Sequence, residues 1–258
     1  MSLRNPIIKE MKQRVYEANL ALPQYGLVKL TWGNVSEIDR ALGVIVIKPS
    51  GVKYEQMAPE QMVVTDLAGN PLEEDGMKPS SDLSTHVILY QAFEKINAIV
   101  HTHSTHSVMW AQAGRDLPAY GTTHADAFYG TIPCTRQLTE EEVKSAYERN
   151  TGHVIVETFQ ERQLAPTEVP GVFVYGHGPF TWGETPAKAV ENSLILDEIC
   201  LMAKENEKIN PAMQSIPQYL LDKHYYRKHG MHACILRSKV TKLAGDYLKS
   251  SHLLIRST

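Results

Sequence analysis

Residues 98–113 read Ala-Ile-Val-His-Thr-His-Ser-Thr-His-Ser-Val-Met-Trp-Ala-Gln-Ala and place a short apolar run directly before a helical pattern. Ala98–Val100 is rich in β-branched residues, which predicts a short buried strand. The strand runs into His101 and His103, and residues 104–113 are then predicted to form a helix. A buried strand with chemically active side chains at its end, followed by a helix, indicates a sheet covered by helices.

The same alternation continues on both sides of this stretch. Apolar residues recur at helical spacing in 6–22, and β-branched runs predict strands at 43–47 and 62–65. We expect further helices at 85–93, 140–149 and 186–203, and further strands or strand edges at 130–133, 152–156 and 170–175. Without a repeat or a long linker, one α/β domain with a helix-covered central sheet is the simplest prediction.

Composition excludes several classes of protein. The chain has 258 residues, of which 43% are hydrophobic and 21% charged, as in ordinary globular domains. A formal net charge of -3 indicates neither a nucleic-acid nor an acidic-membrane partner, and no apolar run approaches the ~18 residues of a membrane span. The N-terminus lacks a signal-peptide pattern. Three cysteines, Cys134, Cys200 and Cys234, are few and odd in number, which favours reduced thiols and a cytoplasmic location.

The histidine pattern indicates a metal site. His101 and His103 are two residues apart on an extended chain, so both imidazoles point to the same side. His177 lies between glycines at the end of the predicted 170–175 strand. Three imidazoles with an open coordination position are typical of catalytic zinc-type sites. The alternative is that these histidines are hydrogen-bonded core or loop residues.

Two turns carry hydroxyl groups at the ends of predicted elements. Lys48-Pro-Ser-Gly51 follows one strand, and Pro79-Ser-Ser-Asp82 precedes a helix. Backbone amides and serine hydroxyls in such turns bind phosphate, and a helix N-terminus adds a favourable dipole. The alternative is that both are ordinary turns, with Asp82 acting as a helix N-cap. The loop Gly121-Thr-Thr-His-Ala-Asp126 carries hydroxyl, imidazole and carboxylate groups and is a third candidate functional segment. The alternative is that it is a plain surface loop.

Several long motifs resemble one known family. They are Ile99-Val-His-Thr-His-Ser104, Gly121-Thr-Thr-His-Ala-Asp126, Tyr129-Gly-Thr-Ile-Pro-Cys-Thr-Arg136, Gly176-His-Gly-Pro-Phe180 and Leu221-Asp-Lys-His-Tyr225. They resemble the L-ribulose-5-phosphate 4-epimerase family, within the class II aldolase/epimerase superfamily, from about Met11 to His232.

This resemblance implies an architecture and a metal centre. The family fold is a single-domain α/β/α sandwich, whose mostly antiparallel central sheet is flanked by helices. The family forms homotetramers with active sites at subunit interfaces. By resemblance His101, His103 and His177 are metal ligands, for one Zn²⁺ or Mn²⁺ per subunit, and Asp82 lies near or on the metal. The related aldolases carry a glutamate at the Asp82 position.

The resemblance also implies a substrate, a reaction and a set of residue roles. L-ribulose 5-phosphate, a small sugar phosphate, is converted to D-xylulose 5-phosphate by retro-aldol cleavage between C3 and C4, rotation of the aldehyde and re-addition. This chemistry belongs to pentose catabolism, such as that of L-arabinose. Asp126 is implied as a catalytic acid/base that reaches a neighbouring subunit's active site. The implied substrate- and phosphate-binding residues are Asn34, Lys48, Ser50, Gly51, Ser80, Ser81, Thr122 and His224.

The chain departs from the family near its C-terminus. The family's second acid/base is a tyrosine in an Ala-Tyr-Tyr-Gly-Gln ending, whereas Ile235 stands at that position here. A possible codon string for residues 235–240, shifted by one base, encodes Tyr-Tyr-Gly-Gln-Lys. We therefore expect a class II aldolase/epimerase domain over 1–232 and an aberrant, out-of-frame tail over 233–258. If the tail is genuine, Tyr247 is a substitute acid/base without a fixed distance from the site.

Two other functions remain open at this point. A class II sugar-phosphate aldolase would share the metal and the phosphate pocket but release both fragments. A catalytically impaired, metal-dependent sugar-phosphate binder would fit the missing tyrosine. A metallohydrolase is a weaker alternative, because no HExxH-type glutamate accompanies the histidines.

Overall fold

The computed structural model of the chain describes residues 5–73 and 76–230. The predicted tail over 233–258, with Ile235 and Tyr247, lies outside the described residues. The helices are α1 (Pro6–Gln24), α2 (Leu83–Ala92), α3 (Thr105–Ala113), α4 (Thr122–Ala125), α5 (Glu140–Glu161), α6 (Pro186–Ile209) and α7 (Gln218–His229). The strands are β1 (Asn34–Asp39), β2 (Val44–Ile47), β3 (Val63–Asp66), β4 (Ala98–His101), β5 (Gly171–Phe173) and β6 (Pro179–Gly183).

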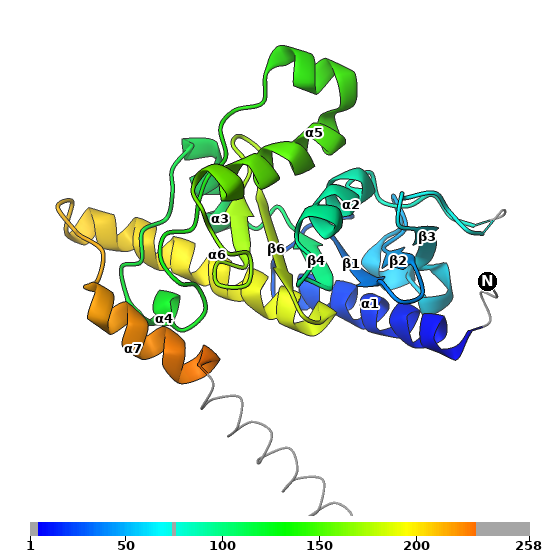
Figure 1. Cartoon of the computed structure of the whole chain (residues 1–258), viewed down its shortest axis with the longest axis horizontal. Coiled ribbons are helices and arrows are strands. Elements are labelled where there is room, and N and C mark those ends of the chain that lie inside the picture. Colours follow the sequence, from blue (N-terminus) through cyan, green and yellow to red (C-terminus); the bar gives the residue numbers. More distant parts are fainter. Residues whose placement is uncertain (1–4, 74–75, 231–258) are drawn as a thin grey trace, which may run out of the picture.

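The described strands form one antiparallel sheet in the order β3-β2-β1-β4-β6-β5. Helices α1 and α6 lie along one face, and α2 and α5 lie on the other (Figure 1). The predicted mixed α/β architecture with a mostly antiparallel, helix-flanked sheet is therefore confirmed. None of the described helices is long and apolar enough to cross a membrane.

The continuous apolar run of β2 follows from burial on both sides of the sheet. Val44 and Val46 contribute to the core under α1, whereas Ile45 and Ile47 contribute to the core on the opposite face. All four are fully buried. Each such side chain removed from water stabilises the fold by about 1.5–3 kcal/mol, so this strand anchors both layers.

One predicted element is wrong. The β-branched content of residues 152–156 predicts a strand, but these residues lie within α5. Gly152 is the contact point with α2: a β-carbon there would lie 2.7 Å from Cβ of Ile88. Close packing of the two helices at this glycine outweighs the local β-propensity. Residues 130–133 form only an isolated bridge, between Leu117 and Ile132, and the strands β1 and β6 were not predicted.

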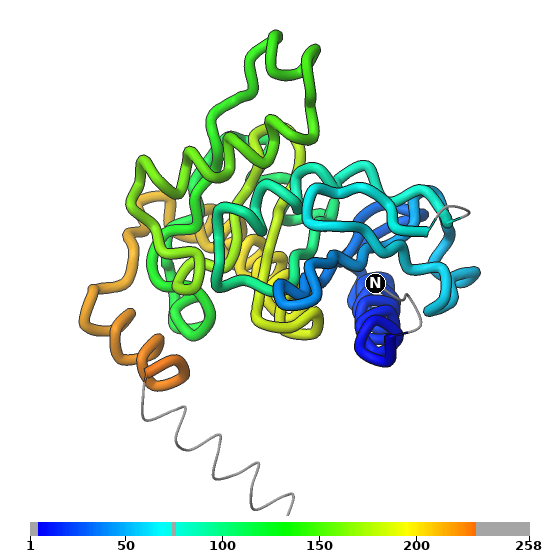
Figure 2. The backbone as a smooth tube through the Cα atoms, turned by 45° about the vertical axis from the view of Figure 1, so that its right-hand side comes forward, coloured from blue at the N-terminus to red at the C-terminus, as the bar shows by residue number. Residues whose placement is uncertain are grey.

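The register of the central strands gathers segments that are distant in sequence. His101, the last residue of β4, pairs with Asn34 of β1 on one side and with Phe180 of β6 on the other. The loop before β1 and the β5–β6 turn therefore meet at the same end of β4. The first turns of α5 and the chain that leads into them project from the body of the molecule in both backbone views (Figure 1, Figure 2).

Candidate active site

A cavity of about 420 Å³ opens where β1, β4 and the β5–β6 turn meet. This is within the size range of small-molecule sites. Its walls come from the loops before β1, after β2 and before α2, and from the first half of α5. The lining residues are Thr31, Trp32, Gly33, Asn34, Lys48, Pro49, Ser50, Gly51, Ser80, Ser81, Asp82, His101, His103, Tyr147, Glu148 and His177.

The structure brings the three predicted histidines together. His101 ends β4, His103 follows two residues later, and His177 lies in the turn between β5 and β6. One ring nitrogen from each lies within 4.8 Å of the others, and the Nε2 atoms of His101 and His103 are 3.1 Å apart. Two nitrogen ligands of one tetrahedral zinc ion are about 3.3 Å apart, from Zn–N bonds of 2.0–2.1 Å. The spacing therefore fits a shared divalent cation.

Hydrogen bonding and burial prepare the imidazoles to bind a metal. Nδ1 of His101 lies 2.9 Å from the carbonyl oxygen of Pro179 and donates to it, which leaves the Nε2 lone pair facing the other rings. Burial and the neighbouring imidazoles lower the pKa of His103 and bring that of His177 to about 3. Both rings are therefore neutral at physiological pH, which is the state that binds a metal.

Aromatic rings and one glycine hold this end of β4 in place. The ring of Phe180 stacks on His101 with centroids 4.2 Å apart, and Trp32 lies 5.8 Å from the ring of His103. Gly33 has φ of +77°, and a β-carbon there would lie 2.8 Å from the carbonyl oxygen of His101. The backbone before β1 can thus approach the histidine strand only because residue 33 is glycine.

Asp82 lies in the same cavity, but outside the group of three converging nitrogens. Although it occupies the N-cap position of α2, its side chain makes no capping hydrogen bond. Its carboxylate instead accepts a 2.7 Å hydrogen bond from the Asn34 amide. Burial alone raises the pKa of Asp82, but the imidazoles of His101, His86 and His177, together with Asn34, hold it below its usual value. The carboxylate is therefore ionised and directed into the site rather than used as a helix cap.

Several of the predicted phosphate-binding residues line the same cavity. Ser50, Gly51, Ser80 and Ser81 all face the cavity, together with Lys48. The Lys48 side chain is buried, and its ammonium lies 5.0 Å above the ring of Tyr54. Burial lowers its pKa, and within the described ranges no carboxylate forms an ion pair with it. A buried cation without a protein counter-ion favours binding of an anion.

The structure places Asp126, Thr122 and His224 away from this cavity. Thr122 begins α4, and Asp126 follows that helix and meets α7. The Asp126 carboxylate lies 3.0 Å from Nδ1 of His224 and within 3.2 Å of both Arg227 and Lys228. Burial raises the pKa of Asp126, but His224, Lys228 and Arg227 together hold it below its usual value. These residues form a second charged group rather than part of the cavity wall.

Five residues that line the cavity are not predicted from the sequence: Thr31, Trp32, Gly33, Tyr147 and Glu148. Thr31, Trp32 and Gly33 directly precede β1, so their place follows only once β1 is recognised. Tyr147 and Glu148 lie inside what the sequence indicates is a surface helix. Their orientation depends on a break in the helix at Ala146, and no glycine or proline at that position indicates the break in the sequence.

Comparison with known proteins agrees with this geometry. Residues 13–203 match the family described as the Class II Aldolase and Adducin N-terminal domain. The chain is 53% identical over 226 residues to the L-ribulose-5-phosphate 4-epimerase UlaF of Salmonella paratyphi C, covering 88% of this chain and 98% of that protein. The corresponding protein of Salmonella typhi is 52% identical over the same length. Among solved structures, an L-fuculose 1-phosphate aldolase superposes with a TM-score of 0.71 at 22% identity, covering 84% of this chain and 95% of that one.

Proposed function

The chain belongs to the Class II Aldolase and Adducin N-terminal domain family, and from its 53% identity to the L-ribulose-5-phosphate 4-epimerase UlaF we infer that it is an isomerase acting on L-ribulose 5-phosphate. It inverts the configuration at C4 and so interconverts L-ribulose 5-phosphate and D-xylulose 5-phosphate in pentose catabolism, including the L-arabinose route. The observation that carries its metal-dependent sugar-phosphate chemistry is the convergence of His101, His103 and His177 in a cavity that is also lined by a buried lysine and serine hydroxyls.

We assign the three histidines as ligands of one divalent cation per subunit, Zn²⁺ or Mn²⁺. Their neutral imidazoles suit both ions. When bound, the ion supplies Lewis acidity that stabilises negative charge on the substrate oxygens during carbon–carbon bond cleavage. We assign Asp82, which lines the same cavity, as a further ligand or as the acceptor of a proton from the substrate. Asn34 orients the Asp82 carboxylate through the hydrogen bond between them.

Lys48, Ser50, Gly51, Ser80 and Ser81 hold the phosphate of the substrate in this proposal. The Lys48 ammonium provides the charge, and the hydroxyl and amide groups provide directional hydrogen bonds. Anchoring the phosphate retains the two-carbon aldehyde after the C3–C4 bond breaks. The aldehyde can then rotate and present its other face before the bond re-forms, which inverts C4.

Inversion requires acid/base groups on both faces of the aldehyde, since the proton leaves one face and returns from the other. We assign Asp126 to one face, with Thr122 and His224 beside it. Because these residues lie away from the cavity of their own chain, this role requires a second subunit. We therefore propose a homotetramer in which the α4–α7 region of one subunit completes the cavity of its neighbour. No nucleic acid or membrane takes part, and the location is cytoplasmic.

We also propose that the class II aldolase/epimerase domain spans 1–232 and that 233–258 is translated out of frame. In support, the UlaF relative is covered over 98% of its length by an alignment of 226 residues, fewer than this chain contains. Sequencing the source gene tests this proposal. An intact reading frame through Ile235 would reject it, and Tyr247 would then become the candidate for the second acid/base.

The activity is tested by incubating the metal-loaded full chain with L-ribulose 5-phosphate and detecting D-xylulose 5-phosphate with a coupled enzyme. We expect turnover that is lost after chelation and in His103→Ala. Accumulation of free aldehyde without D-xylulose 5-phosphate would identify an aldolase instead. Tight substrate binding without turnover would identify a sugar-phosphate binder.

A further inference from the structure

Tyr147 reaches the cavity from a break in α5. The backbone of Ala146 leaves the helical region, with φ of −161° and ψ of 74°, so Glu140–Ser145 forms a separate helical segment. Tyr147 and Glu148 come directly after this break, and both line the cavity. The break therefore turns two side chains of a surface helix toward the histidines.

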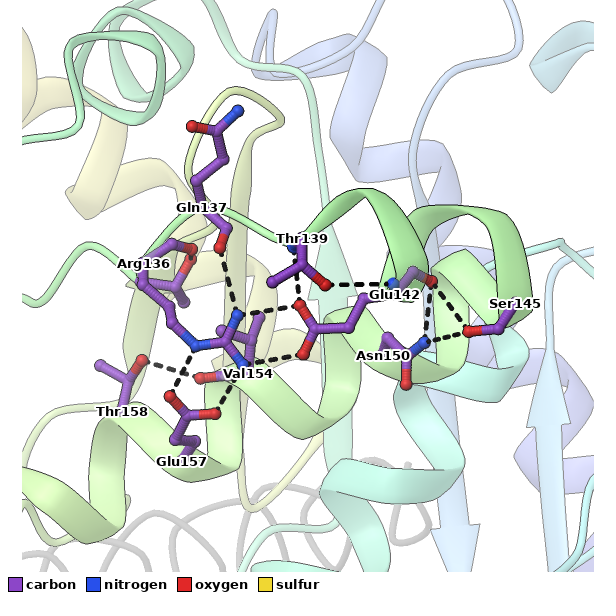
Figure 3. A network of polar contacts seen from close by, with 10 residues as sticks. Arg136, Gln137, Thr139, Glu142, Ser145, Asn150, Val154, Glu157 and Thr158 are labelled. Carbon is purple, nitrogen blue, oxygen red and sulfur yellow. Dashed lines mark hydrogen bonds and ion pairs between the residues drawn. The ribbon is translucent and has the colours of Figure 1, made fainter.

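A network of polar contacts fixes the segment before the break (Figure 3). Thr139 and Glu142 form a reciprocal capping box, which defines where the helix begins. The guanidinium of Arg136 bridges the carboxylates of Glu142 and Glu157, and so ties this segment to the second half of α5. The Asn150 amide donates to the carbonyl oxygen of Glu142 across the break, at 2.8 Å. The broken conformation is thus supported from both sides.

The hydroxyl of Tyr147 lies 3.2 Å from Nδ1 of His177. The two rings are tilted, with centroids 5.9 Å apart. His101 has an equivalent contact, since its Nδ1 donates to the Pro179 carbonyl oxygen. Tyr147 therefore occupies, for His177, the place that a backbone carbonyl occupies for His101.

We propose that Tyr147 is the positioning residue of His177: its hydroxyl oxygen accepts the Nδ1–H hydrogen bond and so presents Nε2 to the metal. This inference rests on the proposed metal site and extends it to a residue outside the ligand set. An imidazole that binds a metal through Nε2 carries its proton on Nδ1, and the acceptor of that proton sets the tautomer and the ring orientation.

A hydroxyl differs from a carbonyl at this position because it also donates. A phenol hydroxyl has one O–H donor together with acceptor lone pairs, so it can accept one hydrogen bond and donate another. While the oxygen accepts from His177, the O–H group remains available to an acceptor in the cavity. The half-buried ring of Tyr147 thus links the third metal ligand to the cavity interior.

The experiment is a zinc titration of the metal-stripped full chain in competition with a chromogenic chelator, comparing wild type, Tyr147→Phe and Tyr120→Phe. Tyr120→Phe is the matched control, because its hydroxyl donates to Glu207 at 2.8 Å and does not line the cavity. We expect Tyr147→Phe to bind Zn²⁺ about 10- to 100-fold more weakly, the usual effect of losing an outer-shell partner. Tyr120→Phe should bind Zn²⁺ as wild type does.

Cobalt provides a second readout that a merely structural role would not change. In the Co²⁺-loaded protein we expect Tyr147→Phe to shift the visible ligand-field bands, since the orientation of one imidazole changes, whereas Tyr120→Phe should leave them in place. Unchanged zinc affinity together with an unchanged cobalt spectrum in Tyr147→Phe would overturn the inference, whatever the melting temperature of the variant.

The outcomes also separate this inference from the proposed function. Wild-type protein that binds zinc but does not convert L-ribulose 5-phosphate, with weaker binding in Tyr147→Phe, would overturn the function and support the role of Tyr147. An active epimerase in which Tyr147→Phe leaves both the zinc affinity and the cobalt spectrum unchanged would overturn only the role of Tyr147. Wild-type protein that binds no metal would overturn both.

Discussion

Replacing Gly33 with alanine places a methyl group against the strand that carries His101. The new β-carbon would lie 2.8 Å from the His101 carbonyl oxygen and 2.7 Å from Cγ1 of Val28. The residue also has φ of +77°, where an L-residue costs about 1–2 kcal/mol. Overpacking adds about 1–3 kcal/mol, so we expect Gly33→Ala to lower the free energy of unfolding by about 2–5 kcal/mol.

Gly43 provides a control that separates the two contributions. It has φ of +70°, but a β-carbon there would meet no atom within 4 Å. Gly43→Ala therefore carries the conformational cost alone, and we expect a loss of about 1–2 kcal/mol. Urea denaturation of both metal-free variants measures the difference between them.

The steric contact also predicts an effect on metal binding. Because the methyl group presses on the backbone of His101, relief of the clash must move that strand end or the loop before β1. We expect Gly33→Ala to bind Zn²⁺ at least about tenfold more weakly, as when support of a ligand is lost, while Gly43→Ala keeps wild-type affinity. Equal stability and equal zinc affinity of the two variants would refute the close approach of residue 33 to His101.

Three further changes test other parts of the structure. His124 is buried and donates from Nε2 to the Gly130 carbonyl oxygen, and burial lowers its pKa to about 4, below the usual 6.5. Below pH 6.5 the unfolded chain therefore binds more protons than the folded protein, and this residue lowers the free energy of unfolding by about 2 kcal/mol between pH 7 and pH 5. In urea denaturation, His124→Gln should lose less stability than wild type over this pH range. An equal loss in the two proteins would be inconsistent with a buried neutral ring. The guanidinium of Arg40 caps the end of α2 by donating to the carbonyl oxygens of Tyr90, Phe93 and Ile96, so Arg40→Ala should lower the free energy of unfolding in urea by about 1–2 kcal/mol. The control Arg115→Ala breaks an exposed ion pair with Glu207 and should cost less than about 1 kcal/mol. A larger loss in Arg115→Ala than in Arg40→Ala would argue against this capping role. Lys48→Met removes the buried ammonium, so KM for the sugar phosphate should rise about tenfold or more without loss of stability in the ligand-free protein, and an unchanged KM would exclude Lys48 from the phosphate site.

The three histidines could be singled out from the sequence because their signals are local, whereas their convergence was implied by the family resemblance and depends on the pairing of β4 with β6. His101 and His103 follow a short β-branched run, and His177 lies between glycines after another such run. Strand periodicity and flanking residues place each of them at or just beyond a strand end. The serine-containing turns at 48–51 and 79–82 were found for the same reason, since turn chemistry depends on adjacent residues.

The remaining parts depend on contacts between distant segments. Tyr147 lines the cavity because α5 breaks at Ala146, and that break is held by Arg136, Glu142 and Glu157 rather than by a local breaker. Residues 152–156 form a helix because α2 packs closely at Gly152. Strand β1 was missed because Asn34, Ser36 and Glu37 interrupt its apolar pattern, although the register beside β4 buries most of the strand.

The central claim is that three imidazoles bind one divalent cation, and the most direct test is the zinc content per chain after equilibrium dialysis of wild type and His103→Ala. The account predicts one tightly bound ion per wild-type chain and loss of that ion in His103→Ala, since two remaining imidazoles cannot complete the ligand set. Wild-type protein without a stoichiometric ion, or His103→Ala that retains it with unchanged affinity, would contradict the account.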